Sequence, residues 1–317
     1  MRDDTSSLNV GNKKISIERK FMQNELRGMG VALVTPFKVD GAIDFDALKR
    51  LVEYQITNGT DYLVVLGTTA ETPTLTEQEK QDVIQTVVSV AKGRVPLVLG
   101  MGGNNTQHLI ETIRHSEFTG IDALLSVTPY YNKPSQEGLY RHYEAVSKAS
   151  PLPIVLYNVP GRTGVNMQAE TTLRLAHDFK NIVAIKEASG NFTQIDDIIK
   201  NKPEHFSVIS GDDGITYPLI TAGAVGVISV IGNAFPREFS RMVRLALAGD
   251  YQRALLIHHQ FTELIKLLFV EGNPAGVKSM LAAMGFIENK LRLPLVPTTI
   301  TTYEKIRRVL DQLDIKA

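Results

Sequence analysis

The stretch NIVAIKEASG, residues 181–190, places a lysine at the end of an apolar run. Residues 182–185 are continuously apolar rather than alternating, and the polar residues that follow Lys186 are typical of a strand end. Continuous hydrophobicity indicates that both faces of a strand are covered, as in a parallel sheet wrapped by helices. The stretch therefore predicts a buried parallel strand with an ammonium group at its carboxyl end.

Seven further apolar runs alternate with amphipathic stretches along the chain. The other runs are 31–35, 62–67, 95–100, 123–128, 153–159, 206–211 and 225–230. The helical stretches are 44–58, 77–92, 106–119, 136–149, 168–178, 192–201, 214–222 and 236–248. Thr76 and Glu79 have the spacing of a capping box at the start of the second helix. Eight such units over about 220 residues predict an α/β fold, a closed (β/α)8 TIM barrel.

An open doubly wound sheet is the alternative. It would place a Gly-rich phosphate turn after the first strand, where this chain has PFKVDG. The stretch GMGGNN at 100–105 lacks the full spacing of a dinucleotide-binding turn and predicts a tight loop at a strand end. The glycine pattern thus favours the barrel.

Three regions are expected along the chain. Residues 1–21 are polar and mixed in charge, which predicts a disordered tail without a secretory signal. Residues 22–248 form the predicted barrel. In 249–317 the strand signal is absent, and helical periodicity at 250–271, 275–285 and 302–315 predicts a C-terminal helical appendage.

Composition excludes several classes of function. The 317 residues contain 34 Lys plus Arg, 34 Asp plus Glu and no blocks of like charge, so no nucleic-acid partner is expected. No apolar run is long enough to cross a membrane. Cysteine is absent, which excludes thiolate chemistry and disulfides. The cytoplasm is the expected location.

Catalytic groups of a barrel sit where strands end and in the loops just beyond. The candidates so placed are Thr35, 67–71, Asn104, 128–131, 157–158, Arg162, 186–187 and 211–213. Lys186 is the only amine among them. An ordinary lysine, with a pKa of about 10.4, would extend its ammonium to solvent. In apolar surroundings desolvation lowers the pKa of a lysine, and the neutral amine can form a Schiff base.

Hydroxyl groups accompany this amine at other strand ends. Tyr157, Thr68 and Tyr131 can form a chain that moves protons, although each alone is also explained by packing. Thr68 and Thr69 could cradle a carboxylate or belong to an ordinary loop. Arg162, in the Gly-rich loop VPGRTG, suits bidentate binding of a second carboxylate.

No metal or other cofactor is expected. Asp212 and Asp213 lack a third ligand at suitable spacing, so capping of the next helix is the favoured interpretation. His258 and His259 are neighbours on a predicted helix, where adjacent side chains point to different faces.

Six motifs in order resemble the dihydrodipicolinate synthase family of pyruvate-dependent class I aldolases. They are GTTAE at 67–71, VTPYYNKPSQEGLY at 127–140, YNVPGRTG at 157–164, IKEASGN at 185–191, SGDDG at 210–214 and LFVEGNP at 268–274. The resemblance runs from about residue 28 to the C-terminus and leaves only the N-terminal tail uncovered.

The resemblance implies roles for individual residues. Lys186 would form the Schiff base with pyruvate, and Tyr157, Thr68 and Tyr131 would relay protons. Tyr131 would be donated across a dimer interface, within a homotetramer that is a dimer of dimers. The substrate-binding residues would be Thr69 for the pyruvate carboxylate, Gly211 and Ile228 for the pocket lining, and Arg162 for the carboxylate of L-aspartate 4-semialdehyde. The product would cyclise and enter the diaminopimelate route to lysine.

Related families keep the lysine and tyrosine but use another acceptor. N-acetylneuraminate lyase and 2-keto-3-deoxy sugar acid aldolases are the enzymatic alternatives, and a keto-acid sensor is the alternative outside enzymology. Arg162 favours the synthase, because a guanidinium suits a short acidic aldehyde better than a polyhydroxylated sugar. The intact lysine, tyrosine and threonine set argues against a sensor.

Two departures from the family pattern stand out. Ala70 replaces the glycine at the fourth position of the usual GTTGE, a change expected to leave the chemistry intact. In relatives sensitive to lysine, the inhibitor site uses a histidine and a glutamate where this chain has Glu77 and His108, although Asn104 and Tyr130 fit. These four residues form the possible allosteric set, and inhibition by lysine is not expected.

Overall fold

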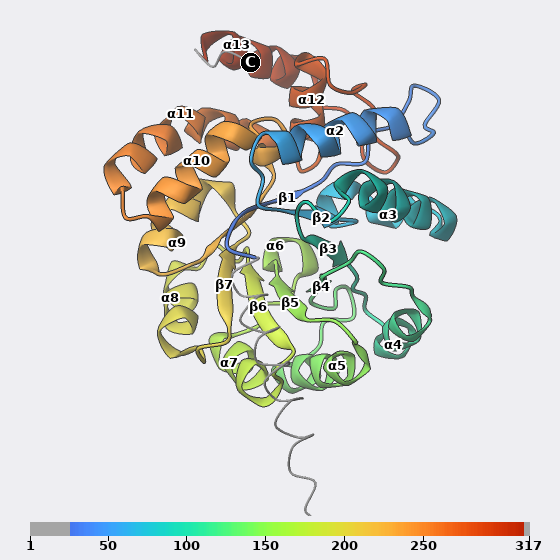
Figure 1. Cartoon of the computed structure of the whole chain (residues 1–317), viewed down its shortest axis with the longest axis vertical. Helices are drawn as coiled ribbons and strands as arrows, with labels where there is room; N and C mark the ends of the chain where they lie inside the picture. The colour runs from blue at the N-terminus through green and yellow to red at the C-terminus, as the bar shows by residue number, and fades with distance from the viewer. Residues whose placement is uncertain (1–25, 314–317) are drawn as a thin grey trace, which may run out of the picture.

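The computed structural model describes residues 26–313. Eight parallel strands close into a barrel in chain order, because β1 pairs with β8 as well as with β2 (Figure 1). The strands are β1 (Gly28–Ala32), β2 (Tyr62–Val65), β3 (Leu97–Gly100), β4 (Ala123–Val127), β5 (Ile154–Asn158), β6 (Ile182–Glu187), β7 (Ser207–Ser210) and β8 (Gly226–Ser229). The predicted (β/α)8 barrel is confirmed.

Helices connect the strands and surround them. They are α2 (Phe45–Thr57), α3 (Glu77–Ala91), α4 (Thr106–His115), α5 (Gln136–Ala149), α6 (Pro160–Thr163), α7 (Ala169–Asp178), α8 (Phe192–Asn201), α9 (Thr216–Ala222) and α10 (Pro236–Leu247). The capping box at α3 is confirmed, since Glu79 N donates to Thr76 Oγ1 at 3.2 Å and Thr76 N to Glu79 Oε2 at 2.9 Å. The stretch VPGRTG after the fifth strand, expected as a Gly-rich loop, contains the single turn α6.

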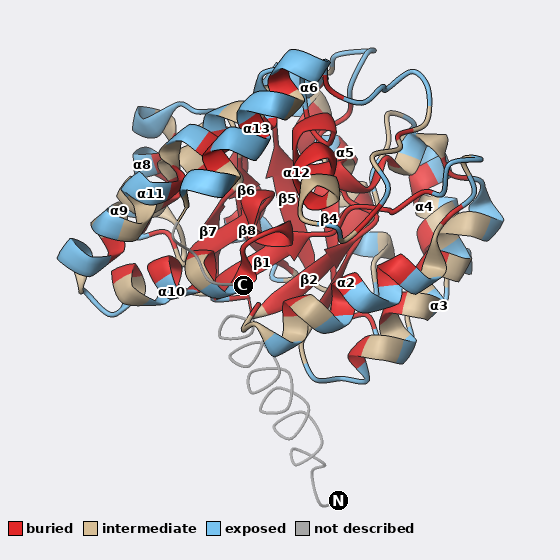
Figure 2. Cartoon of the chain, turned by 90° about the horizontal axis from the view of Figure 1, so that it is seen from above, coloured by how far each residue is buried: buried red, intermediate tan, exposed pale blue. Residues whose placement is uncertain are grey.

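The core has two parts. Side chains such as Val98, Val155 and Ile209 fill the inside of the barrel, while a larger cluster lies between the strands and the helices. Figure 2 accordingly shows buried strands at the centre and helices whose outer faces are exposed. Both faces of the strands are covered, as continuous hydrophobicity predicts.

The first strand differs from its predicted range. It spans Gly28–Ala32 instead of 31–35, so Thr35 lies beyond its end. The missed residues include Gly30, where an added Cβ would lie 2.1 Å from Tyr62 Cε2. Because the tyrosine ring occupies the space of a side chain, this strand begins with glycines, which carry no hydrophobic signal.

Three further helices complete the described chain: α11 (Tyr251–Phe269), α12 (Ala275–Ala283) and α13 (Ile300–Gln312). They agree with the expected C-terminal helical region, and α11 packs against α10 of the barrel (orange and red in Figure 1). The predicted tail, 1–21, lies outside the described residues, and the boundary at residue 248 stays a prediction.

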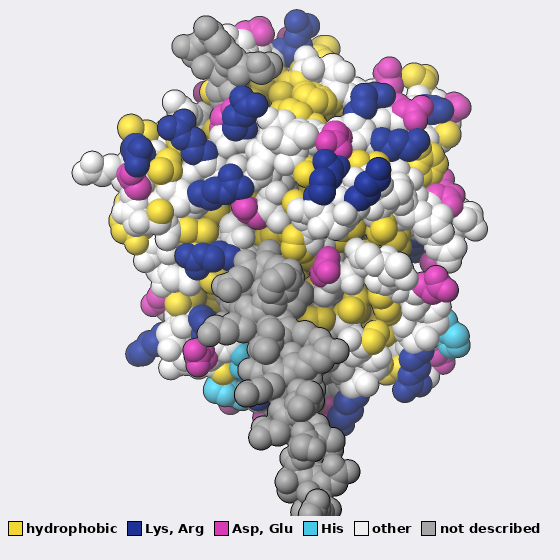
Figure 3. Space-filling model, in the orientation of Figure 1, with side chains coloured by type: hydrophobic (Ala, Val, Ile, Leu, Met, Phe, Trp, Pro, Cys, Tyr) yellow, Lys and Arg dark blue, Asp and Glu magenta, His cyan; other side chains and the backbone are white. Residues whose placement is uncertain are grey.

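The surface carries charges of both signs. On the face drawn in Figure 3, basic and acidic side chains lie among polar and apolar ones. Within residues 26–313, no helix combines the length and apolar character needed to cross a membrane.

Candidate active site

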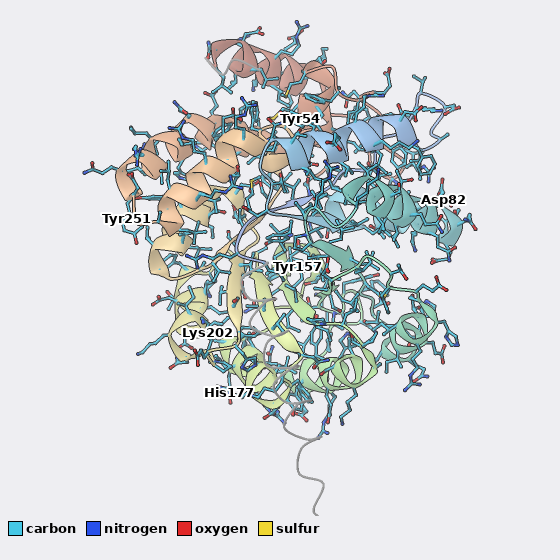
Figure 4. The ribbon with its side chains drawn as sticks, viewed as in Figure 1. Tyr54, Asp82, Tyr157, His177, Lys202 and Tyr251 are labelled. Carbon is cyan, nitrogen blue, oxygen red and sulfur yellow. The ribbon has the colours of Figure 1, made fainter. Side chains whose placement is uncertain are left out.

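Lys186 lies inside the barrel near the carboxyl end of β6. Its side chain is 5% exposed, and it pairs in register with Tyr157 of β5 and with Ile209 of β7. The Lys186 Nζ lies 4.2 Å from the centroid of the Tyr157 ring. Figure 4 shows Tyr157 near the centre of the barrel, whereas the other labelled residues lie around the outside. The amine is thus held in a confined space against an aromatic ring.

The space for the lysine depends on Gly211, which directly follows the next strand, β7. An added Cβ at Gly211 would lie 3.1 Å from Lys186 Cε and 2.8 Å from Ala188 Cβ, closer than ordinary contacts. Ile228 of β8 is buried in the interior cluster. Gly211 therefore leaves room for the lysine side chain, and Ile228 belongs to the apolar interior of the barrel.

Thr68 and Thr69 lie in a 3-10 turn, Thr68–Ala70, directly after β2. The turn ends at Glu71, which adopts the left-handed conformation with φ 56°. Ala70, the departure from the family motif, has a negative φ and is buried, and its carbonyl accepts from Thr35 Oγ1 at 2.8 Å. An alanine therefore fits this turn without backbone strain.

A cavity of about 570 Å³ opens at these residues, and Thr68, Tyr157 and Arg162 line it. Arg162 comes from α6, and its Nη2 donates to the carbonyl of Asn273 at 3.0 Å. The same cavity extends between α3 and α4. All four residues of the possible allosteric set line it there: Glu77, Asn104, His108 and Tyr130.

Tyr131 is placed differently. Its side chain is 89% exposed, its φ is 70°, and among the described residues it is not one that lines this cavity. Asn104 Nδ2 donates to the Tyr130 carbonyl at 3.2 Å and its own carbonyl accepts from Asn132 Nδ2 at 2.9 Å, so the loop around Tyr131 is tied to the one after β3. Within the described chain, Tyr157 contacts Lys186 and shares one cavity with Thr68, whereas Tyr131 lies apart from them.

The two aspartates after β7 have separate roles, which corrects part of the expectation. Asp212 caps a 3-10 turn, Asp213–Ile215, through a bond from Gly214 N at 2.8 Å. Asp213 does not cap. Its Oδ2 accepts from the backbone N–H groups of Val230 and Ile231 at 2.9 and 2.8 Å, and burial raises its pKa to about 6. Sequence alone could not show this, because the partners follow another strand.

A buried carboxylate also follows the candidate lysine directly. Glu187 accepts from Asn158 Nδ2 at 2.8 Å and from Ser189 Oγ at 2.6 Å, and burial raises its pKa. The bond from Asn158 joins β5 to β6, and the bond from Ser189 ties the loop after β6 to the same carboxyl group. Within 26–313, no group of three or more His, Cys, Asp or Glu side chains is arranged to hold a metal ion.

Two residues of the C-terminal region were missed by sequence reasoning. Asn273 donates from Nδ2 to Thr69 Oγ1 at 2.9 Å, and Lys278 forms a buried ion pair with Glu71. The only signal was the motif LFVEGNP, which contains Asn273 but does not indicate what it contacts. Both contacts join segments more than 200 residues apart in sequence.

A confined lysine at the end of a barrel strand, with a tyrosine ring against it and hydroxyls nearby, defines the class of Schiff-base-forming barrel lyases. The model of the dihydrodipicolinate synthetase family matches residues 25–313, and the chain belongs to this family.

Known relatives agree with that assignment. The chain is 72% identical over 291 residues to the 4-hydroxy-tetrahydrodipicolinate synthase of Parabacteroides distasonis, covering 92% of this chain and 98% of the relative. A solved monomeric dihydrodipicolinate synthase variant is 44% identical with a TM-score of 0.89, covering 91% and 97%. The chloride-inhibited enzyme of Acinetobacter baumannii, solved with pyruvate, is 42% identical with a TM-score of 0.87, covering 90% and 98%.

Proposed function

We propose that the protein is a 4-hydroxy-tetrahydrodipicolinate synthase that condenses pyruvate with L-aspartate 4-semialdehyde, a step of the diaminopimelate route to lysine. The observation that carries the proposal is the buried Lys186 amine, 4.2 Å from the centroid of the Tyr157 ring. Tyr157 lines one cavity with Thr68 and Arg162, which gives that cavity an acid–base group and a ligand for a carboxylate. The pyruvate bound by the Acinetobacter relative supports the first substrate.

The proposed chemistry uses the amine as a nucleophile. Lys186 attacks C2 of pyruvate, and loss of water leaves a Schiff base. Loss of a proton from C3 gives an enamine, whose carbon attacks the aldehyde carbon of the semialdehyde. Ring closure follows, as the amino group of the semialdehyde replaces Lys186 at C2 and frees the lysine. Tyr157, Thr68 and Tyr131 are the groups proposed to move the protons of these steps.

The two substrate carboxylates need separate partners. Thr69, buried in the turn after β2, is the proposed partner of the pyruvate carboxylate. Arg162 is exposed to the cavity and is the proposed partner of the semialdehyde carboxylate, which a guanidinium binds with two parallel hydrogen bonds. Gly211 and Ile228 leave the small apolar space that pyruvate requires.

Formation of the Schiff base between Lys186 and pyruvate can be tested by chemical trapping. Incubation with pyruvate and borohydride should add the mass of a reduced pyruvyl group at Lys186, and Lys186→Ala should abolish the adduct. An adduct that persists in Lys186→Ala, or none in the wild type, contradicts the proposal.

The identity of the acceptor aldehyde needs a separate test. Aspartate semialdehyde, N-acetylmannosamine and glyceraldehyde should be compared as partners of the pyruvate enamine, with only the semialdehyde supporting rapid turnover. Faster reaction with either sugar would instead assign the protein to the sugar-acid aldolases.

We also propose a homotetramer, a dimer of dimers, in which Tyr131 enters the site of a neighbouring subunit. The high exposure of Tyr131 supports this, since a large aromatic side chain so exposed is typical of an interface residue. The proposed location is the cytoplasm, which rests on the sequence alone.

A further inference from the structure

Asn273 lies between α11 and α12, yet it contacts two residues at the mouth of the barrel. Its Nδ2 donates to Thr69 Oγ1 at 2.9 Å, and its backbone carbonyl accepts from Arg162 Nη2 at 3.0 Å. Asn273 is itself 7% exposed. One buried residue therefore bridges the turn after β2 and the turn after β5.

The bond to Thr69 determines which way the threonine hydroxyl points. A hydroxyl has one hydrogen to donate, and it accepts through its lone pairs. Because the Asn273 amide occupies a lone pair of Oγ1, the hydrogen of Thr69 is left to donate elsewhere. A carboxylate only accepts hydrogen bonds. The amide thus orients Thr69 as a donor, the role that binding of the pyruvate carboxylate requires.

The hydrogen bond to Arg162 orients the guanidinium that is proposed to bind the semialdehyde carboxylate. A free arginine side chain has many rotamers, and ordering it costs conformational entropy. The Asn273 carbonyl holds one N–H of the guanidinium, and the remaining N–H groups stay available for a bidentate contact. The planar group is therefore oriented before the substrate arrives.

We propose that Asn273 is a positioning residue that orients Thr69 for pyruvate and Arg162 for the semialdehyde. This inference rests on the proposed function, because it assigns the two carboxylates as that function does. Asn273 acts through its two neighbours and takes no part in proton transfer.

The test is a double-mutant cycle on pyruvate binding. Asn273→Leu removes the amide while keeping a neutral side chain branched at Cγ, and Thr69→Val removes the hydroxyl. The concentration of pyruvate that half-saturates borohydride trapping at Lys186 should rise about tenfold or more in Asn273→Leu, the effect of one lost hydrogen bond to a charged group. When Asn273→Leu is added to Thr69→Val, the half-saturating pyruvate concentration should change less than about twofold.

Steady-state kinetics give a second readout. The carbonyl that holds Arg162 remains in Asn273→Leu, so KM for pyruvate should rise more than KM for the semialdehyde. General damage to the fold would instead lower kcat and affect both substrates alike. If Asn273→Leu does not fold, Asn273→Ala takes its place in the cycle. The matched control is Asn201→Leu, because among residues 26–313 the Asn201 amide donates to Asp197 alone, at the exposed end of α8.

The outcomes separate the two proposals. A wild type that forms no adduct overturns both. A wild type that forms the adduct, with Asn273→Leu behaving like Asn201→Leu, overturns the positioning role alone. The positioning role is also overturned if the rise in half-saturating pyruvate concentration in the double variant equals the product of the rises in the two single variants. Asn273 would then act independently of Thr69.

Discussion

The Glu71 carboxylate and the Lys278 ammonium form an ion pair in which neither side chain is exposed to solvent. Glu71 ends the turn that carries Thr68 and Thr69, whereas Lys278 lies in α12. Lys278 also donates to the Lys290 carbonyl at 3.0 Å, and Glu71 accepts from the backbone N of Arg292 at 3.0 Å. α12 and the segment that follows it therefore hold this turn in place, and support the candidate active site from the C-terminal region.

Replacement of Lys278 should destabilise the protein strongly. Lys278→Met leaves the Glu71 carboxylate buried without its partner, which costs about 3–5 kcal/mol of unfolding free energy. Denaturant unfolding measures this cost. Glu71→Gln combined with Lys278→Met should recover part of it, because no charge then stays buried.

The control for that prediction is a surface pair. Lys148 contacts Glu144 at 2.9 Å, but the lysine side chain is 67% exposed. Lys148→Met should cost less than about 1 kcal/mol. Equal losses of unfolding free energy in Lys278→Met and Lys148→Met would show that burial does not determine how much the Glu71–Lys278 pair contributes to stability.

The barrel itself could be predicted from sequence, because eight continuously apolar runs indicate strands that are covered on both faces. The position of Lys186 followed from the same pattern, since the polar residues that end a run mark the mouth of the barrel. The start of β1 could not be predicted. Gly30 is required by the ring of Tyr62, and this close approach leaves no hydrophobic signal.

The contacts that hold the candidate site from the C-terminal region could not be predicted from sequence either. Asn273 and Lys278 reach the turn after β2 from a region read only as helical. Neither residue has periodic neighbours that indicate its contacts, and the pairing depends on how α11 and α12 pack on the barrel. The resemblance to a family pointed to the groups of the reaction, but not to the residues that orient them.

Gly211→Ala should slow formation of the pyruvate adduct. The new Cβ would lie 3.1 Å from Lys186 Cε and 3.0 Å from the Glu187 carbonyl, so the lysine must move. We expect a loss of about tenfold or more in the trapping rate, since small displacements of a nucleophile are costly. Gly161→Ala is the matched control, because among the described residues no atom other than those of its chain neighbours lies within 4 Å of its added Cβ. Similar rates in the two variants would mean that Gly211 does not govern the position of Lys186.

Asp213→Asn should change how stability depends on pH. Burial raises the pKa of Asp213 from 3.8 to about 6, so the folded state binds more protons than the unfolded state between these values. Its contribution to stability is full below about pH 4 and is lost as the pH rises through 6, a change of about 3 kcal/mol. Asparagine does not titrate. Relative to wild type, the variant should therefore gain thermal stability from pH 4 to pH 7, and a constant difference in Tm would contradict the assignment.

Lysine should not inhibit the wild-type enzyme. Glu77 pairs with Lys80 at 2.7 Å, and both line the outer part of the cavity together with His108. The carboxylate expected to bind a ligand ammonium is thus replaced by an imidazole, and Lys80 adds a like charge. Initial rates with added lysine test this, and Glu77→His combined with His108→Glu should make the enzyme more sensitive. Inhibition of the wild type at low lysine concentration would contradict the prediction.

Subunit complementation tests whether Tyr131 acts in a neighbouring site. Tyr131→Phe and Lys186→Ala should each be nearly inactive alone. In a mixed dimer, the site that keeps Lys186 from the first variant receives an intact Tyr131 from the second. If subunits exchange at random, half of the dimers are mixed and each has one complete site, so about a quarter of wild-type activity should return. If Tyr131 instead serves its own chain, every site in the mixture lacks one group and activity stays low. Mixing Lys186→Ala with a Tyr157→Phe variant is the control: Tyr157 and Lys186 share a barrel, so both sites of a mixed dimer stay incomplete and no activity should return.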